Sequence, residues 1–142
     1  MIKDFVLAWD KHKNELEVFF RTHVQEAYFD YEDLVKLLFD IVINPEIKKG
    51  QYDTDNILII DDGDYQGTQI FVLHRNTYQP SVGDYVYTNT YYGSCSGCDT
   101  LQGISCYNYG LKPDETQVKD YMVLCMHLLQ SCEFMKDGEN EE

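Results

Sequence analysis

Three strand-like segments in the middle of the chain limit the folds that this sequence can adopt. They span residues 56–60, 68–74 and 84–90, and polar loops that contain glycine separate them. Loops of this length join antiparallel neighbours, whereas parallel strands need a crossover of about a dozen residues or more. The segments therefore predict a small antiparallel hairpin or meander. The first segment is short and rich in isoleucine, which predicts a buried strand.

Helical periodicity precedes these segments. Residues 1–26 carry apolar side chains at three- and four-residue steps, with a gap at residues 11–13. The gap indicates either two helices or one helix whose middle turn crosses open solvent. Asp30 is the expected N-cap of a further helix, and Asn44-Pro45 is expected to stop it.

The C-terminal part of the chain returns to helical spacing. A short helix is expected within residues 101–110, and the last helix is expected to begin within residues 112–115. This order predicts an α+β domain, in which a small antiparallel sheet of about three strands packs against N-terminal helices and a C-terminal helix. We assign residues 1–136 to this single domain and residues 137–142 to an acidic flexible tail.

The charge balance limits the possible partners. The chain has 25 acidic and 11 basic side chains, a formal net charge of −14. Direct binding to nucleic acid or to an anionic membrane is disfavoured, because both need clustered lysine and arginine. An acidic surface favours basic protein partners instead, although it also serves solubility. No apolar run approaches the roughly 20 residues of a membrane span. The N-terminus does not resemble a signal peptide, so we expect a cytoplasmic protein.

Tyrosine is abundant, with 12 residues in the chain. Its apolar ring and polar hydroxyl suit half-buried strands and contact surfaces. The third strand-like segment alternates, which places Tyr85 and Tyr87 on one face, where exposed tyrosines would serve recognition or self-association. The predicted binding residues are Tyr65, Tyr78, Tyr85, Tyr87, Tyr91, Tyr92, Asp61, Asp62 and Asp64. The dense carboxylates among them suggest either a cation site or a solvated hairpin turn, and their spacing does not match an EF-hand.

Two cysteines follow the third segment at C-x-x-C spacing. Cys95 and Cys98 lie among small residues, in the run Tyr92-Gly-Ser-Cys-Ser-Gly-Cys-Asp99. A strand that leads into C-x-x-C before a helix is the local layout of a thiol-redox site. The βαβ unit and the cis-proline segment of thioredoxin-like proteins are, however, not evident in the sequence.

Zinc is the second interpretation of this pair. Cys106 would be a third ligand, and His74, His127 or Cys132 would be the fourth, since structural zinc needs four ligands in a tetrahedron. A second C-x-x-C motif is absent. The third interpretation is a close-packed glycine-rich turn without chemistry.

Several blocks of sequence carry a resemblance to a protein family. The blocks are residues 61–68, residues 77–81 and residues 92–102, the last reading Tyr-Gly-Ser-Cys-Ser-Gly-Cys-Asp-Thr-Leu-Gln. They resemble a family of small uncharacterised bacteriophage proteins. This resemblance implies a phage accessory protein made in the cytoplasm of the infected bacterium. Small acidic phage proteins often inhibit host proteins, including defence nucleases, so the resemblance implies inhibition by analogy.

The leading hypothesis is therefore a non-enzymatic phage protein that binds a host or anti-phage defence protein and needs no cofactor. The alternative is a zinc-binding or thiol-redox module built on Cys95 and Cys98. A third possibility is a homo-oligomer that sequesters a small molecule in a pocket lined by tyrosines and Arg75.

Overall fold

A computed structural model describes residues 1–64, 66–95, 97–105 and 109–136 of the chain. Tyr65, Cys106 and the predicted tail at residues 137–142 lie outside the described residues. In chain order the elements are α1 (Lys3–Thr22), α2 (Tyr31–Leu37), the π-helical segment η1 (Leu38–Ile43), the 3-10 turn η2 (Asn44–Glu46), β1 (Leu58–Asp61), β2 (Gly67–His74), the 3-10 turn η3 (Val82–Asp84), β3 (Tyr85–Tyr92), α3 (Thr100–Ser105), α4 (Glu115–Gln130) and β4 (Glu133–Phe134).

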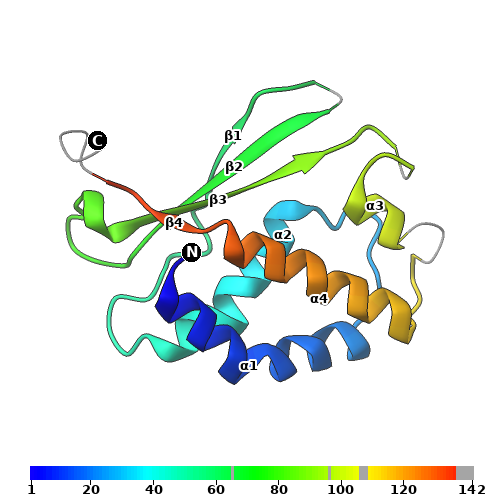
Figure 1. Cartoon of the computed structure of the whole chain (residues 1–142), viewed down its shortest axis with the longest axis horizontal. Coiled ribbons are helices and arrows are strands. Elements are labelled where there is room, and N and C mark those ends of the chain that lie inside the picture. Colours follow the sequence, from blue (N-terminus) through cyan, green and yellow to red (C-terminus); the bar gives the residue numbers. More distant parts are fainter. Residues whose placement is uncertain (65, 96, 106–108, 137–142) are drawn as a thin grey trace.

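The strands form a four-stranded sheet in the order β1-β2-β3-β4, and every neighbouring pair is antiparallel. The helices lie on one side of this sheet, with α4 packed against α1 (Figure 1). The predicted α+β class is confirmed. The fourth strand was not predicted, because β4 has only two residues and pairs only with Val86 and Tyr87 of β3.

The prediction of a buried first strand is wrong. Strand β1 forms one edge of the sheet, and the side chains of Leu58 and Ile60 are 59% and 49% exposed. Both residues point away from the helices, since their partners across the ladder are Val72 and Ile70 rather than the buried Phe71. An apolar run indicates a strand, but it does not indicate how many of its faces a helix covers.

The gap in the N-terminal periodicity is a turn within one helix, because α1 continues from Lys3 to Thr22. The polar side chains of the gap contact η2. The ring of His12 is hydrogen-bonded to Glu46 at 2.7 Å and to Glu15 at 3.1 Å, and Lys11 Nζ lies 3.3 Å from a carboxylate oxygen of Glu46. The lysines of the gap face solvent, and Lys11 and His12 also pair with Glu46, which joins α1 to the end of the second helical region.

The predicted N-cap of α2 at Asp30 is confirmed, and α4 begins within the predicted residues 112–115, with Asp114 as its N-cap. Asp30 accepts a hydrogen bond from the backbone N–H of Asp33, and Asp114 accepts one from that of Gln117, each in a reciprocal capping box. The second helical region does not stop at Asn44. It passes through the π-helical η1 into η2, where proline is tolerated in the first turn.

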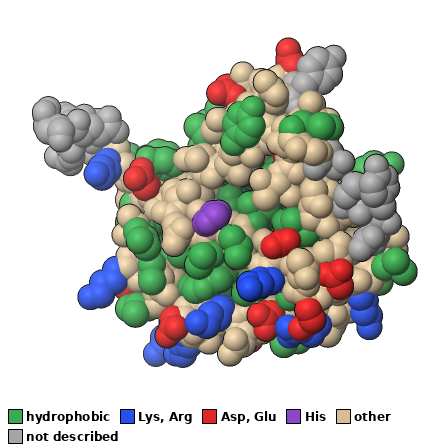
Figure 2. Space-filling model, turned by 45° about the vertical axis from the view of Figure 1, so that its right-hand side comes forward, with side chains coloured by type: hydrophobic (Ala, Val, Ile, Leu, Met, Phe, Trp, Pro, Cys, Tyr) green, Lys and Arg blue, Asp and Glu red, His purple; other side chains and the backbone are tan. Residues whose placement is uncertain are grey.

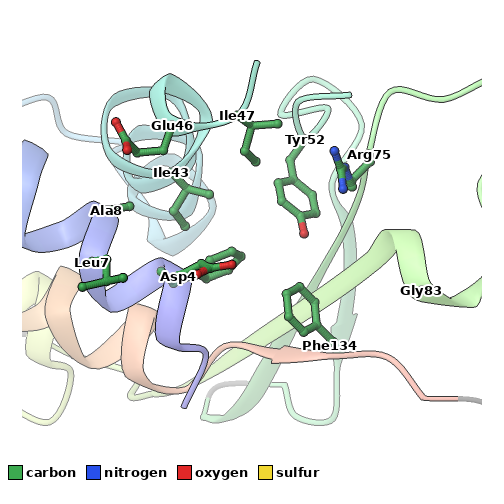
Figure 3. A pocket seen from close by; sticks show the side chains of 11 residues that line it. Asp4, Leu7, Ala8, Ile43, Glu46, Ile47, Tyr52, Arg75, Gly83 and Phe134 are labelled. Atoms are coloured by element: carbon green, nitrogen blue, oxygen red, sulfur yellow. The ribbon is translucent and has the colours of Figure 1, made fainter. Parts of the chain in front are cut away.

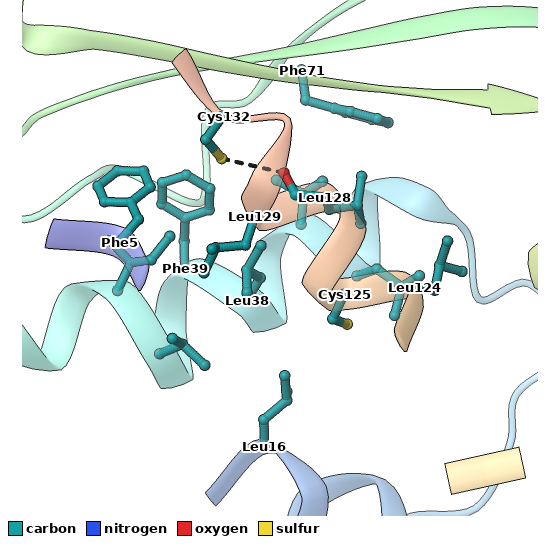
Figure 4. Close-up of a cluster of buried hydrophobic side chains, with 14 of the residues drawn as sticks. Phe5, Leu16, Leu38, Phe39, Phe71, Leu124, Cys125, Leu128, Leu129 and Cys132 are labelled. Atoms are coloured by element: carbon teal, nitrogen blue, oxygen red, sulfur yellow. Dashed lines mark hydrogen bonds between the residues drawn. The ribbon is translucent and has the colours of Figure 1, made fainter. Parts of the chain in front are cut away.

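The hydrophobic core lies between the inner face of the sheet and α1, η1 and α4 (Figure 4). Thr88 of β3 is fully buried, and its hydroxyl donates a hydrogen bond of 2.6 Å to the carbonyl of Leu128 in α4. This bond satisfies the polar side chain and fixes the distance between sheet and helix. The largest fully buried side chains are Phe39, Phe71, Leu16, Leu34, Leu38, Ile43, Leu73, Leu128 and Leu129.

The His12–Glu46 pair should make stability depend on pH. Hydrogen bonding to Glu46 raises the pKa of His12 above its ordinary value of 6.5, so the folded state binds this proton more tightly. The contribution to the free energy of unfolding is fully present below that ordinary value and is lost as the pH rises through the folded-state pKa. Urea denaturation at pH values between about 6 and about 8.5 measures the free energy of unfolding. This free energy should fall more steeply with rising pH for the native chain than for His12→Gln. Parallel profiles for the two chains would contradict this prediction.

Candidate functional site

The face of the sheet that turns away from the helices is the first candidate site. Alternate residues of each strand point to this face, and residues paired across the ladder point to the same side of the sheet. The register therefore defines which side chains lie on it. We call this set the outer sheet face. It consists of Leu58, Ile60, Thr68, Ile70, Val72, His74, Tyr85, Tyr87, Asn89, Tyr91 and Glu133.

The outer sheet face is apolar and aromatic at its centre and polar at its ends. Val72 lies in the middle and is only 9% exposed, whereas Leu58 and Tyr91 at the margins are 59% and 58% exposed. Tyr87 donates a hydrogen bond of 2.7 Å to Glu133. Contiguous exposed apolar surface of this kind is typical of interaction sites. The free edge of β1 adds unpaired backbone groups that another strand can pair with.

The predicted binding residues do not form one patch. Tyr85, Tyr87 and Tyr91 lie on the outer sheet face, whereas Tyr92 pairs with Gly67 on the inner side. Tyr78 is 96% exposed in the loop between β2 and β3, at the other end of the sheet from the β1–β2 turn.

Two of the three predicted carboxylates of the β1–β2 turn, Asp61 and Asp62, accept hydrogen bonds from protein donors. Asp61 accepts hydrogen bonds from the Tyr92 hydroxyl at 2.6 Å, from a backbone N–H and from the Gln69 amide. The Tyr92 bond is the main cause of the lowered pKa of Asp61. Asp62 accepts the backbone N–H of Thr68 at 2.7 Å, while Asp64 is exposed in the same turn. These bonds are those of a closed hairpin turn, which is the second of the two interpretations of the acidic run.

The second candidate site is the cysteine loop, residues 93–99. The Sγ atoms of Cys95 and Cys98 lie 2.7 Å apart, and both residues are exposed and free. The backbone N–H of Cys95 donates to the sulfur of Cys98 at 3.0 Å, and the Ser94 hydroxyl lies 3.7 Å from it. The side-chain contact with Cys95, followed by that with Ser94, lowers the pKa of Cys98. The loop thus holds two sulfurs together and favours the thiolate at the second.

Asp99 holds this loop on the body of the protein, and the sequence alone did not single it out. It is 5% exposed, and its carboxylate accepts hydrogen bonds from three groups. These are the Gly93 N–H at 2.8 Å, the Gln102 N–H at 2.9 Å and the Tyr31 hydroxyl at 3.2 Å. A side chain at Gly93 would place its Cβ 2.3 Å from the carbonyl oxygen of Cys98, so only glycine fits there.

A groove of about 450 Å³ adjoins the loop. Its walls are the connection between α1 and α2, which includes Tyr28 and Phe29, together with Tyr92 and Gln102. Tyr28 is 94% exposed at its rim. The groove therefore places an exposed aromatic ring beside the anchored loop, a feature that neither periodicity nor motif spacing reveals.

The described residues do not complete a zinc site. No group of three or more histidine, cysteine, aspartate or glutamate side chains converges in them to hold a metal ion. Cys132 is fully buried and donates to the Leu128 carbonyl, and burial raises its pKa to about 12. His74 lies beside Tyr85, at the end of the sheet opposite the cysteine loop. The third predicted ligand, Cys106, falls outside the described part of the chain.

Comparison of the chain with protein-family models, with curated protein sequences and with solved structures finds no match. Among the described residues, no helix is both long enough and apolar enough to span a membrane. The site must therefore be interpreted from its own geometry.

Replacement of Asp99 by alanine should destabilise the protein. The variant would leave the donors of Gly93, Gln102 and Tyr31 without their acceptor, and Tyr31 is itself only 5% exposed. We expect a loss of about 2–4 kcal/mol in the free energy of unfolding. Chemical denaturation measures this loss. Asp120→Ala, on the exposed side of α4, is the control and should change it by less than about 0.5 kcal/mol. Equal effects of the two substitutions would contradict the anchoring role.

Proposed function

We propose that this chain is a non-enzymatic bacteriophage accessory protein that binds a host or anti-phage defence protein through the outer sheet face. The observation that carries the proposal is an apolar and aromatic surface that no helix of the described residues covers, with Leu58, Ile60 and Tyr91 each about half exposed or more. Binding surfaces commonly combine buried aromatic anchors with a polar rim. The phage assignment rests on the sequence resemblance, and it places the interaction in the cytoplasm of the infected bacterium.

The charge of this surface favours a basic partner. None of the side chains on the outer sheet face is lysine or arginine, while Glu133 lies at its margin and Asp61 and Asp62 lie at one end. On the side of the molecule in Figure 2, basic groups and carboxylates alternate along the lower edge, and further carboxylates lie near the top. With a net charge of −14, the chain would attract a basic surface and repel acidic competitors.

The test is a comparison of three immobilised chains in a bacterial lysate. The sheet variant, Leu58→Lys with Ile60→Lys, replaces two apolar side chains of the outer sheet face by charged ones. The helix variant, Val18→Lys with Val123→Lys, makes the same change at exposed positions of α1 and α4. We expect the native chain and the helix variant to retain the same protein from the lysate. The affinity of this protein for the sheet variant should be at least about tenfold lower.

Circular dichroism should show that both variants remain folded. The proposal would be overturned if the native chain retained no protein, or if all three chains retained the same protein equally. Association of the native chain with itself, lost in the sheet variant, would also overturn it and would assign the surface to self-assembly.

A specific observation favours a second candidate function, that of a reversible dithiol. Cys95 and Cys98 hold their sulfurs 2.7 Å apart at the surface, and the pKa of Cys98 is lowered. The Cys98 thiolate would attack a disulfide of another protein and form a mixed disulfide with it. The Cys95 sulfur would then attack the sulfur of Cys98 and release the partner's second thiol. The pair would lose two protons and two electrons as its S–S bond forms, and the partner disulfide would become two thiols.

Thiol alkylation tests this candidate. Because the thiolate is the reactive form, a lowered pKa should let Cys98 react with iodoacetamide near neutral pH faster than an ordinary exposed thiol. Cys125 and Cys132, whose pKa values burial raises, should react only after unfolding. Mass spectrometry of peptides locates each modification. Cys95→Ser should slow the reaction at Cys98, since the contact that lowers its pKa is weakened. If Cys98 were alkylated at the same rate in the folded and in the denatured protein, the dithiol function would be contradicted.

A further inference from the structure

A cavity of about 430 Å³ lies at the end of the molecule away from the cysteine loop. The start of α1, the segment from η1 to η2 and strand β4 meet around it (Figure 3). Its size is that of a pocket for a small organic molecule. Neither the outer sheet face nor the dithiol uses it.

A buried tyrosine hydroxyl opens into this cavity. Tyr52 is 5% exposed, and Figure 3 shows its hydroxyl pointing into the cavity between Arg75 and Phe134. No hydrogen bond of this hydroxyl to another described residue is found, and no fully buried side-chain N or O atom among them lacks a partner, so the hydroxyl opens to the space of the cavity. Burial raises the pKa of Tyr52 to about 12, so the hydroxyl keeps its proton and can donate it to an acceptor.

Hydrogen bonds to its backbone hold this tyrosine in place. The amide of Asn44 donates to the carbonyl of Tyr52 at 3.0 Å, and the Asn44 side-chain oxygen accepts the Tyr52 N–H at 2.8 Å. Tyr52 also forms an antiparallel bridge with Arg75. The ring packs edge-on against Phe39 at 5.4 Å and Phe5 at 6.1 Å between centroids. The position of the hydroxyl is therefore set before any ligand arrives.

Arg75 supplies a positive charge on the same wall. Its Nε and Nη2 atoms donate to the carbonyls of Gly50 and Lys49, each at 2.7 Å, and Gly50 has a φ of +74°. These bonds hold the guanidinium in place, and no hydrogen bond from its Nη1 is found among the described residues. In the described ranges no carboxylate forms an ion pair with Arg75, despite the acidic composition of the chain.

The remaining walls limit the ligand further. Phe5 and Phe134 form an aromatic corner, with their centroids 5.8 Å apart and their planes at 72°. Asp4 lies on the exposed rim and would repel a multiply charged anion. Glu46 also contributes to the lining, but His12 and Lys11 already pair with it.

We propose that this cavity binds a small aromatic monocarboxylic acid, whose carboxylate contacts the Arg75 guanidinium and the Tyr52 hydroxyl while its ring lies against Phe5 and Phe134. Arginine and a neutral hydroxyl are strong donors to a carboxylate. The edge-on rings of the corner suit an aromatic body. This inference is independent of the proposed protein partner, because the outer sheet face lies outside the cavity.

The experiment titrates the full chain with 2-naphthylacetate and, separately, with its neutral analogue 2-naphthylacetamide. Two-dimensional NMR follows the resonances of Ile43, Ile47 and Phe134, which line the cavity. We expect saturable shifts of these resonances with the acid. Binding of the amide should be at least about tenfold weaker, because it lacks the charge that Arg75 recognises.

Tyr52→Phe is the decisive variant, since it removes one hydroxyl that has no partner in the described residues and keeps the packed ring. It should fold with unchanged stability and bind 2-naphthylacetate about tenfold more weakly. Tyr85→Phe, on the outer sheet face, is the matched control and should bind as the native chain does. Three results would each overturn the proposal: no shift at the cavity, equal binding of acid and amide, or undiminished binding by Tyr52→Phe.

Discussion

The inner face of the sheet is the surface on which the rest of this fold depends. Phe71, Leu73 and Val86 on this face are all fully buried, and Thr88 beside them is hydrogen-bonded to the carbonyl of Leu128. Because α1, η1 and α4 all pack on this one side, the helices of the described residues cover one face of the sheet and leave the other uncovered. The exposure of the outer sheet face is therefore a consequence of the architecture, and it is the reason that this domain has a broad apolar surface.

The β1–β2 turn and the cysteine loop meet in space, whereas residues 77–81 lie at the other end of the sheet. Tyr92, at the end of β3, donates to Asp61 and to the Gly63 carbonyl in the β1–β2 turn. One residue later, Gly93 is bound to Asp99 and begins the cysteine loop. The turn and the loop, which are separated by the whole length of β2 and β3, thus form one connected end of the molecule. The hydrogen bonds inside this end give structural roles to Asp61, Asp62 and Asp99. The close approach of Cys98 gives one to Gly93.

The sequence predicted those parts of the fold that local chemistry determines. The cap at Asp30 follows from side-chain hydrogen bonds within one turn, and the alternation in β3 follows from the covering of one face. The exposure of Ile60 and the anchoring of Asp99 depend on segments far away in the chain, so no local pattern reports them. The same holds for the predicted tyrosine cluster: composition shows that tyrosines are frequent, but only strand register assigns Tyr87 and Tyr92 to opposite faces. The binding, redox and metal roles of these residues stay predictions.

The cavity beside Tyr52 and the cysteine loop lie at opposite ends of the sheet, as its register shows. This distance makes the two sites physically independent. Tyr52 forms its bridge to Arg75 just beyond the end of β2, whereas the cysteine loop begins beside Gly67, at the start of the same strand. Eight residues of extended chain lie between these two ends, a span of roughly 25 Å. Substitutions this far apart, with no shared partner, normally have additive effects on stability. A change in the cavity should therefore leave the environment of Cys98 intact, so that ligand binding and thiol chemistry can be separated in one protein.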